Sequence, residues 1–288
     1  MYTMRPAEFQ YHRPTSVEEA VALLDDEARP LAGGHSLLPL MKLRFAMPAA
    51  LVDLSGLSGL DGIAEADGGL RIGALATHAS VAASALVGER CAVLAETAAD
   101  IGDRQVRNRG TIGGSVAHAD PAADYPTVLT ALGATIRATG TAGERDIAAA
   151  DFFRGVFETA LESGELVTSV QVPPTRPGTG AVYLKHRHPA SRYAVVGVAA
   201  LVAVEGGACT RAQLVIGGVA GAPVVATAAS EALVGSALSE ESIAAAAERA
   251  GEALSDPLSD TYASGEYRAQ IARVLARRAL ATAQARAA

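Results

Sequence analysis

The sequence is poor in aromatic residues and cysteine. It has no tryptophan, its aromatic residues make up 4% of 288 residues, and its two cysteines are Cys91 and Cys209. An iron–sulfur cluster needs four ligands, usually thiolates, so this chain cannot bind one by itself. The two cysteines are most simply small buried hydrophobic residues. Half of the residues are hydrophobic, so the cores must be built mainly from alanine, valine and leucine.

Other absences exclude whole classes of protein. No uncharged apolar run reaches the roughly 18 residues that suggest a membrane span. Residues 1–6 contain no basic segment leading into an apolar one, so export is not expected. The net charge of −7 argues against a nucleic-acid partner. The sequence also lacks a Gly-x-x-x-x-Gly-Lys-Ser/Thr loop, and no Gly-x-Gly-x-x-Gly follows a predicted strand, which excludes a P-loop and disfavours a Rossmann site.

Lysine is scarce too. Among 24 basic residues only Lys42 and Lys185 are lysines. A lysine in such an arginine-rich chain can mark a site that needs the compact charge of an ammonium group and cannot accept the wider, planar guanidinium of arginine. The alternative is that both lysines are chance survivors.

Two glycine-rich runs are the most informative feature present. They read Ala32-Gly33-Gly34-His35-Ser36 and Thr111-Ile112-Gly113-Gly114-Ser115. Paired glycines allow positive φ angles and let the backbone approach a ligand closely. Successive backbone N–H groups form an anion-binding concavity. Each run alone is most simply a tight turn. The two matching runs together indicate a clamp for a pyrophosphate, with a pair of tight turns as the alternative.

The first predicted region, residues 1–56, alternates strands and helices. Strands are expected at 9–13, 29–32 and 51–54, with helices at 17–24 and 37–45. Ser16 and Glu19 have the spacing of a capping box at the start of the first helix. This order of elements predicts an α/β start.

The second and third predicted regions are residues 57–176 and 177–288, divided at the Pro173–Gly178 linker. The second contains a hairpin over 62–73, helices at 77–86, 91–99 and 124–132, and strands at 134–138 and 166–172, with Asp124 as a helix N-cap. The third contains strands at 181–187, 194–204 and 209–217 followed by helices at 225–233, 240–254 and 266–285. We therefore predict an α+β protein with a two-lobed α/β domain and a C-terminal domain of antiparallel sheet and helices.

Both glycine runs lie in longer segments that resemble a known family. Ala32-Gly-Gly-His-Ser-Leu-Leu-Pro-Leu-Met-Lys42 and Gly110-Thr-Ile-Gly-Gly-Ser-Val-Ala-His-Ala-Asp-Pro121 resemble the FAD-binding loops of the medium subunit of molybdenum hydroxylases, a family that includes xanthine dehydrogenase and aerobic carbon monoxide dehydrogenase. Residues 11–16, 28–34 and 266–280 resemble the carbon monoxide dehydrogenase branch. The resemblance covers essentially the whole chain and implies an FAD-binding domain like that of p-cresol methylhydroxylase.

The resemblance also implies roles for individual residues. Backbone N–H groups of Ala32 to Ser36 and of Thr111 to Ser115 would hold the FAD pyrophosphate. Asp124 would contact the ADP end of the cofactor. Lys185 and Tyr193 would lie beside the isoalloxazine, where a lysine stabilises negative charge on the reduced ring. Ile101 and Val167 match positions with apolar or backbone contacts to the cofactor.

The sequence departs from the family at Ser115, where several relatives have asparagine, so one side-chain contact can differ. His118 with Asp120, and His186 with His188, invite a metal interpretation. We expect no metal in this chain, because zinc needs three or four ligands with an ordered second shell.

The function implied is an FAD-containing electron-transfer subunit. A large partner would carry the molybdenum cofactor and a small partner two [2Fe–2S] clusters, in a dimer of heterotrimers that passes electrons to an external acceptor. The expected location is the cytoplasm, with attachment to the inner face of the membrane left open. Carbon monoxide is the first expectation for the substrate, with aldehydes, purines and other N-heterocycles as alternatives, and the acceptor (quinone, NAD or oxygen) stays open.

Two other functions remain open from the sequence. One is a self-contained FAD reductase or oxidase, such as the family that reduces enolpyruvyl sugar nucleotides. The other is a nucleotide-binding module without redox chemistry. Arg104, Arg107 and Arg109 precede the second glycine run and would line a partner interface, face phosphates or form a solvated basic stretch.

Overall fold

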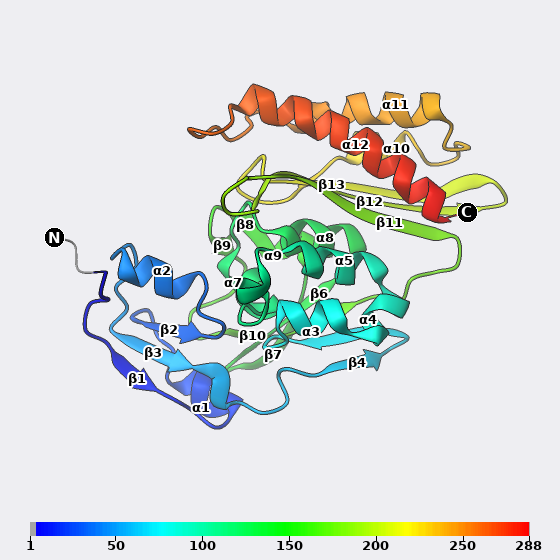
Figure 1. The fold of residues 1–288 in the computed structure, drawn as a ribbon. Coiled ribbons are helices and arrows are strands. Elements are labelled where there is room, and N and C mark those ends of the chain that lie inside the picture. The colour runs from blue at the N-terminus through cyan, green and yellow to red at the C-terminus, as the bar shows by residue number, and fades with distance from the viewer. Residues whose placement is uncertain (1–3, 288) are drawn as a thin grey trace.

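The computed structural model describes residues 4–287, so residues 1–3 and 288 of the first and third predicted regions lie outside it. Three main sheets follow one another along the chain (Figure 1). Within the described residues no helix has the length and apolarity that crossing a bilayer requires.

The first sheet is small and parallel. Its strands are β1 (Gln10–His12), β2 (Ala28–Leu31) and β3 (Ala50–Asp53), in the order β1-β3-β2. Helices α1 (Val17–Ala22) and α2 (Leu37–Lys42) connect them, and the short turn η1 (Leu54–Gly56) follows. The β-α-β-α-β prediction is confirmed. Helix α2 ends three residues before the predicted Phe45, and Arg44 turns the chain away at a φ of 60°.

The second sheet is antiparallel, in the order β4-β5-β10-β6-β7. Its strands are β4 (Ile63–Ala66), β5 (Gly69–Gly73), β6 (Thr135–Gly140), β7 (Gly143–Ala148) and β10 (Leu166–Val172). Strand β7 was not predicted. Its sequence, Gly-Glu-Arg-Asp-Ile-Ala, is mostly polar because it lies at the sheet edge and is largely exposed.

Helices lie between the strands of this sheet along the chain. They are α3 (His78–Ala83), α4 (Ala85–Arg90), α5 (Ala92–Asp100), α6 (Arg104–Arg107), α7 (Ile112–His118), α8 (Asp124–Leu132) and α9 (Ala149–Phe152). Of these, α4, α7 and α9 pack directly on the sheet. The predicted helix over 77–86 is two helices, because Ser84 is extended and its side chain caps α4. A short pair, β8 (Phe153–Gly155) and β9 (Glu158–Thr159), follows α9.

The third sheet belongs to the C-terminal part. Strands β11 (Thr179–Arg187), β12 (Ala194–Glu205), β13 (Ala208–Gly217) and β14 (Val224–Val225) are antiparallel neighbours in that order. Helices α10 (Thr227–Glu231), α11 (Glu240–Arg249) and α12 (Gly265–Ala287) cover its outer face (Figure 1), and η2 (Ala250–Ala253) replaces the end of the predicted 240–254 helix.

Helix α8 lies between the second and third sheets, and all nine of its residues are buried. Strand β12 alternates between two cores. Val198 and Ala200 face the helices of the C-terminal part, whereas Ala199 and Leu201 face the core that contains α8. A strand buried on both faces explains the continuous apolar run over 194–204. This packing fixes α8, and with it Asp124 at its first position.

Candidate functional site

The two glycine loops are in direct contact. A Cβ on Gly33 would clash with the carbonyl oxygen of Arg109 and lie 2.8 Å from Cα of Gly110. The second loop is also bonded to the segment after β5, since His78 N–H donates to the Gly110 carbonyl at 2.9 Å and Ile112 N–H to the Ala76 carbonyl at 3.0 Å. Three segments that are distant in sequence therefore form one backbone assembly.

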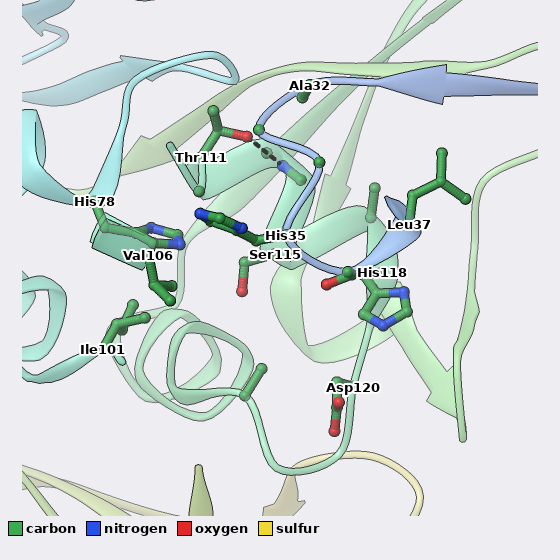
Figure 2. A pocket seen from close by; sticks show the side chains of 18 of the residues that line it. Ala32, His35, Leu37, His78, Ile101, Val106, Thr111, Ser115, His118 and Asp120 are labelled. Atoms are coloured by element: carbon green, nitrogen blue, oxygen red, sulfur yellow. Dashed lines mark hydrogen bonds between the residues drawn. The ribbon is translucent and has the colours of Figure 1, made fainter. Parts of the chain in front are cut away.

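The second glycine run is the first turn of helix α7. Thr111 is the N-cap, and its hydroxyl accepts from Gly114 N–H at 3.1 Å (Figure 2). Gly113 N–H donates to the Ala74 carbonyl at 2.9 Å and Ser115 N–H to the Thr111 carbonyl at 3.0 Å. The N–H groups of Ile112 to Ser115 are thus already used inside the protein, whereas that of Thr111, the first residue of the predicted Thr111 to Ser115 cradle, has no acceptor among the described residues.

The first loop presents a run of three consecutive backbone donors. Within residues 4–287, no hydrogen-bond acceptor pairs with the backbone N–H groups of Gly34, His35 or Ser36. Gly34 has a φ of +76° and is the one glycine of the two pairs in the left-handed region. The expectation that these glycines adopt positive φ is therefore wrong for the other three. Gly33 is required because the backbone of Arg109 and Gly110 packs too closely for a side chain, and Gly113 and Gly114 are helical.

A cavity of about 560 Å³ lies beside these loops (Figure 2). Most of the sequence-predicted site residues line it: Ala32, Gly33, Gly34, His35, Ser36, Ile101, Thr111, Gly113, Gly114, Ser115, Asp124, Val167 and Tyr193. Two do not. Ile112 is fully buried in the core, and Lys185 lies behind Asp124.

Sequence reasoning missed several lining residues. Leu75, His78, Val106 and Leu166 belong to no recognisable motif, and the fold alone brings them to the cavity. His118 and Asp120, considered above for a metal, also line it. Arg107 donates to the carbonyls of Ile101 and Gly102 and so has a structural role near the cavity.

Asp124 and Lys185 form a buried ion pair. Lys185 Nζ lies 2.8 Å from Asp124 Oδ2, and the Tyr183 hydroxyl donates to Asp124 Oδ1 at 2.7 Å. The side chains of Lys185 and Asp124 are 1% and 5% exposed. Burial raises the pKa of Asp124, while Lys185 and the Tyr183 hydrogen bond oppose that rise. The predicted helix cap is wrong, because Ala123 is the N-cap of α8 and the carboxylate of Asp124 is engaged by Lys185.

Tyr193 ends the turn between β11 and β12. It is 42% exposed and lines the cavity beside Ser191 and Arg192. Burial of the ring raises the pKa of its hydroxyl, and the charges of Asp120 and Asp124 add to that rise. Tyr193 is therefore a neutral aromatic side chain at the cavity wall.

His78 is a neutral histidine in the same wall. It is 5% exposed, and its Nδ1 has no hydrogen-bond partner among the described residues. Burial lowers its pKa to about 4, with smaller contributions from His35 and Arg107. Figure 2 shows its ring beside that of His35.

Two family models together match most of the chain. Residues 7–175 match the FAD binding domain in molybdopterin dehydrogenase, and residues 181–283 match the CO dehydrogenase flavoprotein C-terminal domain. The chain belongs to the family of FAD-binding subunits of molybdenum hydroxylases.

Named relatives of this flavoprotein subunit match over almost their whole length. The chain is 41% identical to the carbon monoxide dehydrogenase medium chain of Afipia carboxidovorans, covering 99% of each. It is 40% identical to subunit alpha of the 6-hydroxypseudooxynicotine dehydrogenase complex of Paenarthrobacter nicotinovorans, covering 99% of this chain and 97% of that protein. A chain of carbon monoxide dehydrogenase from Hydrogenophaga pseudoflava superposes with a TM-score of 0.95 at 40% identity, covering 98% and 99%.

The residues of the cavity fit the cofactor of this family. The first loop offers the backbone donors that a pyrophosphate requires. Gly114 carries no side chain where a Cβ would lie 2.8 Å from Thr111 Oγ1 and 3.9 Å from the Cβ of Ala32. Leu40, Ile101 and Val106 supply apolar wall for an aromatic ring system.

Gly33→Ala in this flavoprotein subunit should separate the two loops. The new methyl group would clash with the Arg109 carbonyl, so we expect flavin affinity to fall at least about tenfold, or 1.4 kcal/mol, with a lower Tm. Flavin content per chain and thermal unfolding measure both effects. Gly88→Ala is the matched control, because a Cβ there has open space within helix α4. Unchanged flavin content in Gly33→Ala would show that the loop contact is dispensable.

Lys185→Met should destabilise the subunit strongly. It leaves the Asp124 carboxylate buried without its cation, a change that typically costs about 3–5 kcal/mol of unfolding free energy. The double variant Lys185→Met/Asp124→Asn should recover part of the loss, because it removes the uncompensated charge. Denaturant unfolding of the three proteins measures this. A single-variant loss below about 1 kcal/mol, within the range of surface pairs, would contradict the buried ion pair.

His78 should make stability depend on pH. Its folded pKa is about 4, below the ordinary 6.5, so the unfolded state binds more protons between these values. The stabilisation is complete above about pH 6.5 and is lost progressively as pH falls from 6.5 to about 4, and the loss reaches about 2–3 kcal/mol by pH 4.5. Urea unfolding at pH 7.5 and 4.5 should show this loss, and His78→Gln should reduce it. An identical loss in both proteins would remove His78 from the explanation.

Proposed function

We propose that this chain is the FAD-containing electron-transfer subunit of a multi-subunit molybdenum hydroxylase, with aerobic carbon monoxide dehydrogenase as the first candidate for the complex. The observation that carries the proposal is the cavity beside the two contacting glycine loops, of which the first presents unpaired backbone donors. The match of both family models supports it.

Each wall of the cavity would hold a different part of the cofactor. The N–H groups of Gly34, His35 and Ser36 would bind the pyrophosphate, and the bare Cα of Gly114 would allow it to approach α7. Ile101, Val167 and Tyr193 would pack against the ring system, and Asp124 would contact the cofactor with its charge balanced by Lys185. Bound FAD would supply the redox chemistry, because a flavin exchanges electrons singly or in pairs.

The electrons would come from other chains. Cys91 and Cys209 are both buried, and two thiols fall short of a cluster's usual four ligands. We propose a large partner with the molybdenum cofactor and a small partner with two [2Fe–2S] clusters, assembled as a dimer of heterotrimers that reduces an external acceptor. Within the chain we propose three regions, residues 1–56, 57–176 and 177–288.

The substrate of the complex is a separate question. Relatives named for carbon monoxide and for 6-hydroxypseudooxynicotine are 41% and 40% identical to this chain. Two sequence identities this close do not discriminate between the two substrates, as expected when the substrate is oxidised on another subunit. Carbon monoxide stays the first candidate, and aldehydes and N-heterocycles are the alternatives.

Acid denaturation of the purified chain tests the cofactor assignment. We expect one FAD per chain, released into the supernatant, because binding through backbone donors requires no covalent link to the protein. FMN instead of FAD would contradict the pyrophosphate argument, and flavin retained on the precipitate would contradict noncovalent binding. A chain that binds nucleotide but no flavin would be a non-redox module. A chain that oxidises substrate alone at the rate of the assembled complex would be a self-contained enzyme.

A further inference from the structure

Three cations converge on Asp100, the last residue of helix α5. Its carboxylate lies 2.8 Å from Arg187 and 3.1 Å from Arg192, and Lys185 Nζ lies 3.8 Å from it. The Asp100 carbonyl also accepts from Lys185 Nζ at 3.1 Å. The Asp100 side chain is 22% exposed, so these pairs are partly shielded from solvent.

The position of Asp100 runs against the usual preference of helices. Negative side chains are unfavourable at a helix C-terminus, where the carbonyl ends already carry partial negative charge. The three cations compensate for the charge of the side chain, and Lys185 also bonds the carbonyl end. A residue that breaks a local preference while making several specific contacts is expected at a functional site.

On one side Asp100 supports the wall formed by Asp124. Lys185 lies between the two carboxylates, 2.8 Å from Asp124 and in contact with Asp100 through both the carbonyl and the side chain. Loss of the Asp100 charge would leave Lys185 held by Asp124 and by the Asp100 carbonyl, without the second carboxylate. Asp100 is therefore part of the group of side chains that holds Lys185 beside Asp124, together with the Tyr183 hydroxyl that donates to Asp124.

On the other side Asp100 holds the turn that carries Tyr193. Arg192 has a φ of 62°, in the left-handed region that costs a non-glycine residue about 1 kcal/mol or more. The turn has two backbone bonds of its own, from Arg192 N–H to the His188 carbonyl and from His188 N–H to the Tyr193 carbonyl, each 2.8 Å. The Arg192–Asp100 ion pair ties this strained turn to the body of the protein.

We propose that Asp100 is a positioning residue of the cofactor cavity: by holding Lys185 and Arg192 together, it fixes Asp124 and Tyr193 relative to each other. The inference rests on the proposed function of the cavity as an FAD site. Asp100 does not itself line the cavity, so its effect on the flavin passes through those two residues.

Asp100→Asn tests the proposal in the full chain loaded with FAD. The amide keeps the size but removes the charge that holds Arg192 and Lys185, so Tyr193 should lose its fixed place beside the flavin. We expect FAD to bind about tenfold more weakly, flavin fluorescence to rise as the aromatic contact loosens, and the visible circular dichroism of the flavin to change. Glu96→Gln is the matched control, because Glu96 is on the same helix and pairs with Arg286 at 2.8 Å away from the large cavity.

Arg192→Gln is the second variant. Because the Arg192 side chain is half exposed, we expect this substitution to leave folding intact. It should reproduce the fluorescence and dichroism changes with little change in Tm. In the double variant, Asp100→Asn and Arg192→Gln should weaken FAD binding by less than the product of their separate effects, because they break one shared contact. Asp100→Asn combined with Glu96→Gln should show simple multiplication of the single effects.

The outcomes separate the two claims. A wild-type chain without FAD would refute the proposed function. A wild-type chain with FAD whose Asp100→Asn and Arg192→Gln variants keep the wild-type affinity and flavin spectra would overturn the role of Asp100. A lower Tm in Asp100→Asn without any spectral change in either variant would make Asp100 merely structural, and would also overturn it.

Discussion

The close approach of Gly33 to the backbone of Arg109 and Gly110 is the contact on which the rest of the site depends. It joins the parallel first sheet to the helices over the second sheet at a point where no side chain fits. The helix that starts just beyond, α7, is held by hydrogen bonds to the carbonyls of Ala74 and Ala76. The cavity exists because these backbones meet at this distance.

The two glycine loops look alike in sequence but differ in structure. The second loop uses the N–H groups of Ile112 to Ser115 within helix α7 and in bonds to the segment after β5, and Gly113 packs closely against Ala74. The first loop leaves its N–H groups without protein acceptors and turns through positive φ at Gly34. This difference is the basis for proposing that the first loop supplies most of the donors to the anion and that the second loop mainly shapes the cavity. The C-terminal part then completes the site, through Tyr193 at the cavity and Lys185 behind Asp124.

Local patterns predicted much of this architecture. The alternating elements of residues 10–53, the β12–β13 hairpin and the C-terminal helices follow from periodicity and turn residues, and the structure confirms them. The partners of polar groups could not be predicted in the same way. Asp124 had the position of a helix cap, but its actual partner, Lys185, is 61 residues away. The two meet because β11 packs on α5 while its sheet neighbours β12 and β13 pack on α8. His78 and Asp100 belong to no motif, and their surroundings arise only from tertiary packing.

Amide hydrogen exchange of the chain with and without FAD tests the central claim most directly. Without the cofactor, the N–H groups of Ile112 to Ser115 should already exchange slowly, and those of Gly34 to Ser36 should exchange fast, because only the former have protein acceptors. Adding FAD should protect Gly34, His35 and Ser36 by at least about tenfold and leave the α7 amides nearly unchanged. Protection that appears at Ile112 to Ser115 while the first loop stays fast would contradict the account.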